Sequence, residues 1–225
     1  MELRLKALIL FLILLVCNIH LRAQSQFIGI KGGLGPVLMQ DQGLHLARQG
    51  FAFGLVYNYQ KKSRFTFGAE LLYERHGYGD DYTIQQSDGR LEKYLALTNF
   101  NYITTPILIG YTFGNKFYLK PSIGLSPGFL VTATSSYLTF QEPFFDTTYR
   151  KFTGIKTVDI KNAVNTFNLS AMADITIGCH ITGHLDQFLS VRFQGGLTSI
   201  SRDKTIQMWN NDTYFSFGIR YSLTK

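Results

Sequence analysis

Residues 214–223 read Tyr-Phe-Ser-Phe-Gly-Ile-Arg-Tyr-Ser-Leu, near the end of the 225-residue chain. Large apolar side chains occupy every second position from Phe215 to Leu223, and small or polar residues, Arg220 among them, alternate with them. A β-strand places successive side chains on opposite faces, so this stretch predicts a strand with one apolar and one polar face. The pattern decides the fold class because it recurs along the chain.

Strands and connections follow a regular order. Eight stretches alternate in this way: 27–34, 51–59, 64–75, 98–113, 117–132, 166–182, 188–200 and 213–223. Short connections (61–63, 114–115 and 183–186) alternate with long ones (36–49, 76–97, 135–165 and 201–212). Outer-membrane barrels have short periplasmic turns and longer extracellular loops, and in lipid a sheet must close to satisfy its backbone. We therefore predict an all-β fold, an eight-stranded antiparallel up-and-down transmembrane β-barrel.

Two other architectures stay open. Residues 149–158 could extend as a hairpin beyond the membrane, which leaves a ten-stranded barrel as an alternative count. A soluble lipocalin-like barrel is the alternative fold, although a soluble barrel has no reason to separate short connections from long ones.

The first 23 residues have the features of a secretory signal peptide. Arg4 and Lys6 give a basic start, residues 7–17 form an apolar run, and a small residue stands at Ala23. The apolar run is shorter than the roughly 20 residues that a transmembrane helix needs. We predict cleavage after Ala23, export, and residence in the cell outer membrane.

The predicted mature chain, residues 24–225, is one barrel domain. It would keep 19 basic and 14 acidic residues, a dispersed net charge of +5. Without a basic run interleaved with aromatic residues, the sequence predicts no nucleic-acid binding. Cys179 would be its one cysteine, and its position between isoleucines on an apolar strand face favours a small hydrophobe over a nucleophile. Processing into a lipoprotein at Cys17 is the alternative maturation.

Charged residues within the predicted strands fall on the face of the small and polar side chains. They are Lys31, Glu70, Glu74, Lys120, Asp174, Arg192 and Arg220. A Lys or Arg at the lipid midplane costs roughly 2–4 kcal/mol, so we place this set in the lumen. An eight-stranded barrel is only wide enough for its own side chains, and these charges are predicted to pair in a structural network.

Two functional interpretations of the lumenal charges remain as alternatives. One is a proton or ion path, because ionisable residues at membrane depth often have that role. The other is a catalytic carboxylate pair, Glu70 and Glu74. They lie four residues apart on one strand, hence about 13 Å apart, too far for the usual paired-carboxylate geometry.

Other catalytic patterns are weak. His180 and His184 stand where a strand runs into a turn, not on one helix face that would hold a metal. The glycine-rich residues 29–35 lack the strand-then-helix context of a phosphate loop. A membrane hydrolase needs Ser and His grouped at the lipid face, yet His180 is predicted to face inward and His45 and His76 to lie in or beside loops. We expect no catalytic residue, no cofactor and no metal.

Pro106 interrupts the fourth predicted strand. The aromatic residues Phe100 and Tyr102 before it stand out of phase with Ile107 after it, if all three face lipid. Proline also removes a donor from the ladder. This pattern predicts a β-bulge at residues 104–106.

Four blocks of the chain resemble motifs of the PorT-like outer-membrane β-barrel family. They are NYITTPILIGY (101–111), FYLKPSIGLSPGF (117–129), MADITI (172–177) and LSVRFQGGLTSI (189–200). The resemblance implies an eight-stranded barrel of Gram-negative outer membranes. The family's namesake assists a protein-secretion system, and the family supplies no catalytic residues. The chain departs from a common barrel ending because residues 223–225 are Leu-Thr-Lys and contain no aromatic residue.

These observations favour a non-enzymatic outer-membrane barrel that acts through its long extracellular loops or an envelope partner, because loops on a rigid scaffold commonly carry recognition. A narrow solute channel, a secretion-system accessory and a lipid-modifying enzyme are the alternative functions. We expect a monomer in contact with outer-membrane lipid, with an envelope or secretion-system protein as its partner.

Overall fold

The computed structural model describes residues 25–40, 47–61, 63–85, 91–141 and 151–224. Its strands are β1 (Ser25–Gln40), β2 (Arg48–Gln60), β3 (Phe65–Gln85), β4 (Leu91–Thr104), β5 (Ile107–Tyr111), β6 (Phe113–Gly114), β7 (Phe117–Gln141), β8 (Lys151–Asp159), β9 (Phe167–His180), β10 (Leu185–Gly196) and β11 (Trp209–Ser222). A short 3₁₀ helix, η2 (Lys161–Ala163), precedes β9. No helix in the described ranges is long and apolar enough to cross a membrane. The predicted signal peptide and Cys17 lie outside the described residues.

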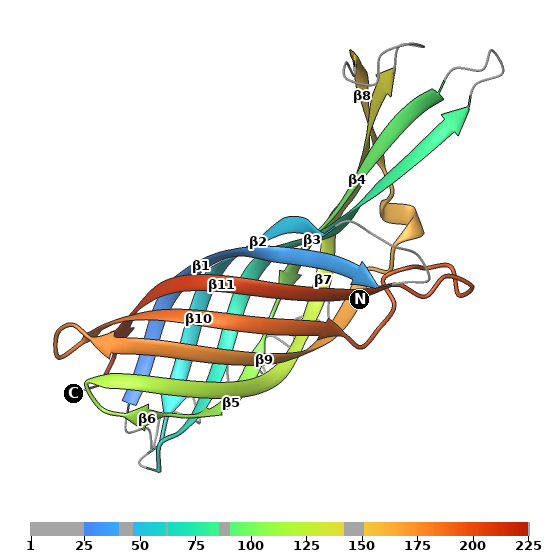
Figure 1. Ribbon diagram of the computed structural model, residues 1–225. Coiled ribbons are helices and arrows are strands. Elements are labelled where there is room, and N and C mark those ends of the chain that lie inside the picture. Colours follow the sequence, from blue (N-terminus) through green and yellow to red (C-terminus); the bar gives the residue numbers. More distant parts are fainter. Residues whose placement is uncertain (1–24, 41–46, 62, 86–90, 142–150, 225) are drawn as a thin grey trace.

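The strands close into an antiparallel ring (Figure 1). The hydrogen-bonded order is β2-β1-β11-β10-β9-β7-β4-β3, and β3 pairs back to β2. Elements β4, β5 and β6 succeed one another beside β7, so they form one interrupted strand and the ring has eight members. The predicted eight-stranded barrel is therefore confirmed. β8 pairs with β7 as a hairpin strand outside the ring, so it does not raise the count to ten.

Side chains alternate between the two faces of the ring as the sequence predicts. On β9, Ile175 and Ile177 keep 47% and 60% of their surface exposed, whereas the alternating residues Asp174 and Thr176 keep 4% each. The large exposed residues of the other ring strands are likewise mostly Ile, Leu and Phe. An apolar outside around a polar inside is the arrangement that lipid requires.

The strands run beyond the ring. β3 and β4 stay paired residue by residue from Tyr78↔Thr98 to Gln85↔Leu91, and β7 pairs with β8 from Thr134↔Asp159 to Gln141↔Lys151. Together they make a four-stranded sheet in the order β3-β4-β7-β8 that leaves the barrel at one end (Figure 1). We refer to residues 79–85, 91–97, 135–141 and 151–158 as the arm.

Three predicted loops are therefore wrong in part. Much of 76–97 and 135–165 is paired strand, and within 36–49 β1 continues to Gln40 and β2 begins at Arg48. Alternation weakens in the arm because a sheet outside the membrane can meet water on both faces and then carries polar residues on both. The extension of β1 still alternates, with Val37 and Met39 buried and Leu38 exposed.

The β-bulge predicted at residues 104–106 is also wrong. The register against β3 continues without a shift from Thr104 to Ile107. β4 and β5 are separated only because Pro106 has no N–H to donate. Its carbonyl still accepts a hydrogen bond from the Glu70 N–H, at 2.9 Å.

The aromatic residues before Pro106 face the lumen. Phe100 and Tyr102 are 2% and 0% exposed inside the barrel. The register shift lies beside them on β7, where Val131 is passed over between the partners of Asn101 and Tyr102. Periodicity alone does not distinguish an apolar lumenal plug from a lipid-facing stripe.

The two ends of the barrel differ. At the arm end, a buried apolar cluster fills the lumen: Met39, Phe100, Tyr102, Leu130, Ala133, Val164 and Ile200. Val164 and Ile200 come from connections, which the Val164↔Ser201 bridge and two hydrogen bonds from Asn165 Nδ2 join. The opposite end, the turn end, carries the tight turns and the points where the described chain starts and stops, since Ser25 pairs with Gln60 and Ser222 with Phe27.

Candidate functional site

Four of the predicted lumenal residues meet in the middle of the barrel. Lys31 Nζ lies 2.8 Å from Glu70 Oε2, and Arg192 Nη1 lies 2.8 Å from the same oxygen. Arg192 also donates from Nε to Asp174 Oδ2 at 3.1 Å. β1, β3, β9 and β10 supply these side chains, and each stands at an inward position of its strand. We call Lys31, Glu70, Asp174 and Arg192 the central cluster.

The central cluster balances two cations against two carboxylates. Its side chains are 2–8% exposed, so every charge is desolvated. A buried charge is tolerated when partners satisfy it, and here Arg192 bridges both carboxylates. The void beside the cluster has a volume of about 10 Å³. That space holds about one water, so the cluster fills the lumen at this level.

A second group joins β3 to β11 nearer the arm end. His76 Nδ1 lies 2.6 Å from Asp212 Oδ2, and His76 Nε2 lies 3.5 Å from Glu74 Oε2. Asn210 Nδ2 donates to the same Asp212 oxygen at 2.9 Å, and the Tyr214 hydroxyl donates to the Arg75 carbonyl at 3.1 Å. The predicted placement of His76 in or beside a loop is wrong, because its side chain is 1% exposed inside the barrel. The histidine links two strands of the barrel wall that β2 and β1 separate.

A third group lies at the turn end. Arg220 Nε donates to Asp186 Oδ2 at 2.9 Å, and Asp186 Oδ1 is hydrogen-bonded to His180 Nδ1. The Arg220 guanidinium lies between two rings, 4.2 Å from the Phe27 centroid and 4.9 Å from that of Tyr118. These contacts fix the guanidinium plane at the mouth of the barrel.

The structure thus places all seven predicted residues inside the barrel, but in separate groups. Glu74 and Arg220 take partners outside the predicted set, His76 and Asp186. Lys120 bonds to an amide, with Nζ 2.8 Å from Asn58 Oδ1. Of the seven residues in the predicted network, only the four of the central cluster therefore contact one another.

Sequence reasoning missed His76, Asp186 and Asp212, which it assigned to connections. The alternation of inward and outward side chains along each strand could have located the two aspartates. Asp212 stands an even number of residues before the inward Arg220, and Asp186 before the inward Arg192. Extending each alternation by one step would have placed both carboxylates in the lumen.

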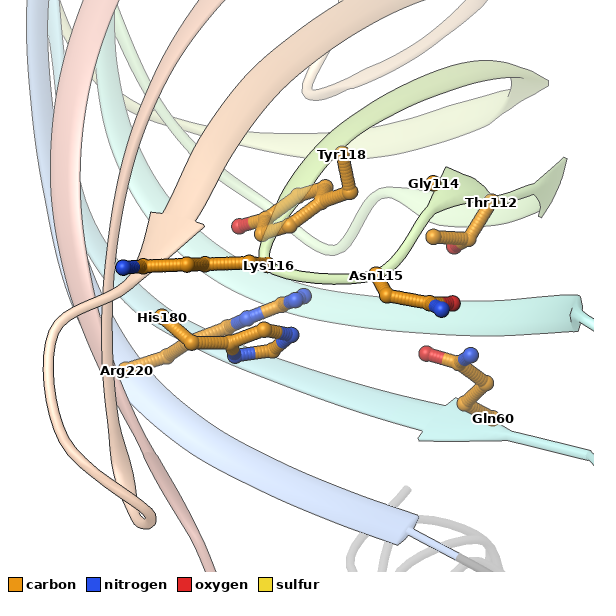
Figure 2. Close-up of a pocket in the computed structure, with 8 residues that line it drawn as sticks. All are labelled: Gln60, Thr112, Gly114, Asn115, Lys116, Tyr118, His180 and Arg220. Atoms are coloured by element: carbon orange, nitrogen blue, oxygen red, sulfur yellow. The ribbon is translucent and has the colours of Figure 1, made fainter.

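A pocket of about 400 Å³ opens at the turn end (Figure 2). Arg220, His180 and Tyr118 line it on one side, and Gln60 and Asn115 on the other. In the described ranges, no group of three or more His, Cys, Asp or Glu residues is placed to hold a metal ion.

Comparison with known proteins assigns the family. The model of a family described as outer membrane protein beta-barrel domain matches residues 23–202. The chain belongs to this family. It is therefore an outer-membrane β-barrel protein. Because barrels of this kind have short periplasmic turns and longer extracellular loops, we assign the turn end to the periplasm and the arm to the cell exterior.

No curated protein matches the chain. Ail, the attachment invasion locus protein of Yersinia pestis, crystallised with the heparin analogue sucrose octasulfate, is 11% identical, with 88% of this chain and 99% of that chain covered and a TM-score of 0.43. OprG from Pseudomonas aeruginosa is 9% identical, with 91% and 98% covered and a TM-score of 0.46. The outer membrane protease OmpT from Escherichia coli is 10% identical, with 89% and 97% covered and a TM-score of 0.39.

Proposed function

We propose that this outer-membrane barrel is a non-enzymatic protein whose arm binds a protein partner at the cell surface. One observation supports the proposal most directly: the sheet continues past the ring as four paired strands, β3-β4-β7-β8. Pairing holds these strands in register outside the membrane, where they add nothing to crossing it. A rigid display of this kind suits recognition.

The two outer strands of the arm, β3 and β8, each pair with a single described strand there. Among the described strands, β8 pairs only with β7, and β3 beyond Arg75 pairs only with β4. Unpaired strand edges are templates for strand addition, with backbone hydrogen bonds giving affinity. On β8, Ile155 is 63% exposed and offers an apolar contact beside that edge.

The closed lumen argues against the channel alternative. The central cluster occupies the middle of the barrel and leaves a void of about 10 Å³, and the apolar cluster fills the arm end. The chemistry of a hydrolase finds little support as well. His76, an imidazole paired with two carboxylates, is 1% exposed and lies between Glu74 and Asp212, and no serine of the described residues is hydrogen-bonded to it.

A photo-crosslinking experiment in intact cells tests the proposal. Benzoylphenylalanine is placed at Ile155 on the arm or at Ile177 in the lipid belt as the matched control. We expect Ile155 to yield a discrete protein adduct and Ile177 to yield none. The adduct must disappear when the other hairpin of the arm, 79–97, is replaced by an Asn-Gly turn in a barrel that still shows the heat-dependent gel shift of folded barrels. A barrel in which 136–157 is replaced as well, the armless barrel, lacks position 155 and serves only the secretion assay below. Adducts of equal yield from both positions, or from neither, would refute a role of the arm.

Within the family, we further propose the PorT-like group, on the strength of the blocks at 101–111 and 117–129. The partner of the arm would then belong to a secretion system. Deletion of the gene should reduce the amount of exported protein in the culture medium, and the armless barrel should fail to restore it. A secreted fraction unchanged by deletion argues against this group and leaves the surface role to the crosslinking test.

A further inference from the structure

The periplasmic pocket carries a second inference, independent of the arm. The arm end of the barrel is closed by apolar side chains, whereas the turn end is hollow over about 400 Å³. Figure 2 shows the Arg220 and His180 side chains reaching into this space from one side, with the Asn115 and Gln60 amides on the other. The pocket is therefore lined by hydrogen-bond donors that converge.

The guanidinium of Arg220 is held in place while its two terminal nitrogens have no hydrogen-bond partner among the described residues. The residue is 4% exposed, its plane lies between the Phe27 and Tyr118 rings, and only its Nε is hydrogen-bonded to the described protein, at Asp186. Both terminal nitrogens are left to donate. A guanidinium with two parallel free N–H groups matches a carboxylate or phosphate in a bidentate contact.

The neighbouring carboxylate does not compete for this role. One oxygen of Asp186 accepts from Arg220 and the other is bonded to His180. The Tyr118 hydroxyl, by contrast, is buried and lacks a hydrogen-bond partner in the described structure. This hydroxyl lies over Gly178 of β9, and Tyr118 forms part of the pocket wall.

The rim around the pocket is basic. The side chain of Lys116 lines the pocket, and Arg64 donates from Nη2 to Asn115 Oδ1 at 3.5 Å, which leaves the Asn115 NH₂ group as a donor. Over the described residues of this end, 57–61, 63–67, 109–120 and 177–189, the one acidic residue is Asp186. The only repulsive charge that an anion meets among these residues is therefore the Asp186 carboxylate, which both Arg220 and His180 contact.

We propose that this pocket is a binding site for an oxyanion, a carboxylate or phosphate group, held by the terminal nitrogens of Arg220. His180 and the Asn115 amide complete the donor set, and Lys116 attracts the anion from the rim. A periplasmic solute and the head group of an anionic phospholipid in the inner leaflet both present this chemistry.

Nuclear magnetic resonance of the folded barrel tests the site. The mature chain is prepared in a maltoside detergent, which contributes no anion, and titrated with inorganic phosphate or with acetate. We expect saturable shifts confined to the amides around residues 114–118 and 178–181. Arg220→Lys keeps the positive charge beside Asp186 but loses the paired terminal nitrogens of the guanidinium. The dissociation constant of the anion should therefore rise at least tenfold. Lys116→Gln should raise it by a few-fold, and Lys204→Gln, on an exposed extracellular connection, should leave it unchanged.

Lipid nanodiscs then identify the source of the anion. If the ligand is a lipid head group, phosphatidylglycerol discs reproduce the phosphate shifts that phosphatidylcholine discs lack. If it is a solute, both discs give the same spectrum and phosphate still titrates. The proposal is overturned if neither phosphate nor acetate gives saturable shifts at the mouth. It is also overturned if Lys116→Gln and a folded Arg220→Lys bind as the unaltered chain does. Neither result bears on the arm, so this site and the proposed surface role fail separately.

Discussion

Arg192 is the residue on which the closed lumen most depends. Its guanidinium contacts both Glu70 and Asp174, each within 3.1 Å, from a position 2% exposed. Without it, two desolvated carboxylates would share the single ammonium of Lys31. Removing one partner of a buried ion pair is costly because the other charge remains buried.

We expect Arg192→Met to lower the free energy of unfolding by about 3–5 kcal/mol. Urea unfolding in lipid vesicles, followed by the emission of Trp209, the one tryptophan of the chain, measures the change. Arg202→Met, at an exposed arginine of an extracellular connection, is the control and should change stability by less than about 0.5 kcal/mol. Equal stabilities of the two variants would show that the central cluster does not hold the barrel.

The two carboxylates on His76 make unequal contributions. Asp212 lies 2.6 Å from the imidazole and also accepts from Asn210, whereas Glu74 lies 3.5 Å away and neither of its oxygens is hydrogen-bonded in the described structure. Hydrogen bonds to a charged group are worth about 1.5–3 kcal/mol. We therefore expect Asp212→Asn to cost about 2 kcal/mol and Glu74→Gln less than about 1 kcal/mol. The reverse order in the same urea assay would contradict the assigned pairing.

At this scale, the sequence was sufficient to place charges on the inward face and insufficient to pair them. Parity along a strand puts Lys31, Glu70 and Arg192 inside the barrel. Which of them meet depends on the stagger between strands, and no periodicity within one strand reports the stagger. For that reason the sequence predicts one network that contains both Arg192 and Arg220, although Arg220 bonds to Asp186 near the mouth.

On the neighbouring strands β7 and β9, the side chain of Tyr118 lies over Gly178. A Cβ atom added at Gly178 would lie 2.1 Å from the Tyr118 hydroxyl and 2.7 Å from the Gln187 carbonyl oxygen. The tyrosine ring thus takes the space above a residue without a side chain. A Cβ atom added at Gly32, on the outer face of β1, would have no atom within 4 Å.

We expect Gly178→Ala to lower the free energy of unfolding by about 1–3 kcal/mol, the usual cost of overpacking. The matched variant Gly32→Ala should be nearly neutral, because its methyl group points into lipid. Thermal gel-shift assays on the two folded barrels compare them directly. A Gly178→Ala barrel as stable as Gly32→Ala would show that Tyr118 does not lie over this position.

Element lengths were the least predictable part of the fold. Within the membrane, alternation located the middle of every ring strand, since one face meets lipid and the other a polar lumen. Beyond it, β3 and β7 continue as hairpin strands whose two faces both meet water, and alternation no longer reports them. At residues 104–106, alternation predicted an irregularity that is not there. The inward Phe100 and Tyr102 are large and aromatic and therefore look like lipid-facing residues.

Considered as a whole, the molecule has an apolar outside, a charged and closed middle, and two unlike ends. The outside is tested by a pair of isoleucines. Ile177 on β9 and Ile155 on the arm are 60% and 63% exposed, but only the first is placed to face lipid. We expect Ile177→Lys to cost about 2–4 kcal/mol in vesicles and Ile155→Lys to cost almost nothing. Equal costs would contradict the assigned membrane boundary.

The closed lumen is the central claim, and planar-bilayer recording tests it most directly. The purified mature barrel is inserted into a lipid bilayer in 1 M potassium chloride under an applied potential. The ion pairs of Arg192, Glu70, Lys31 and Asp174 leave room for about one water, so the structure predicts no current steps. Regular single-channel steps from the unaltered barrel would contradict a filled lumen and restore the narrow channel as its function.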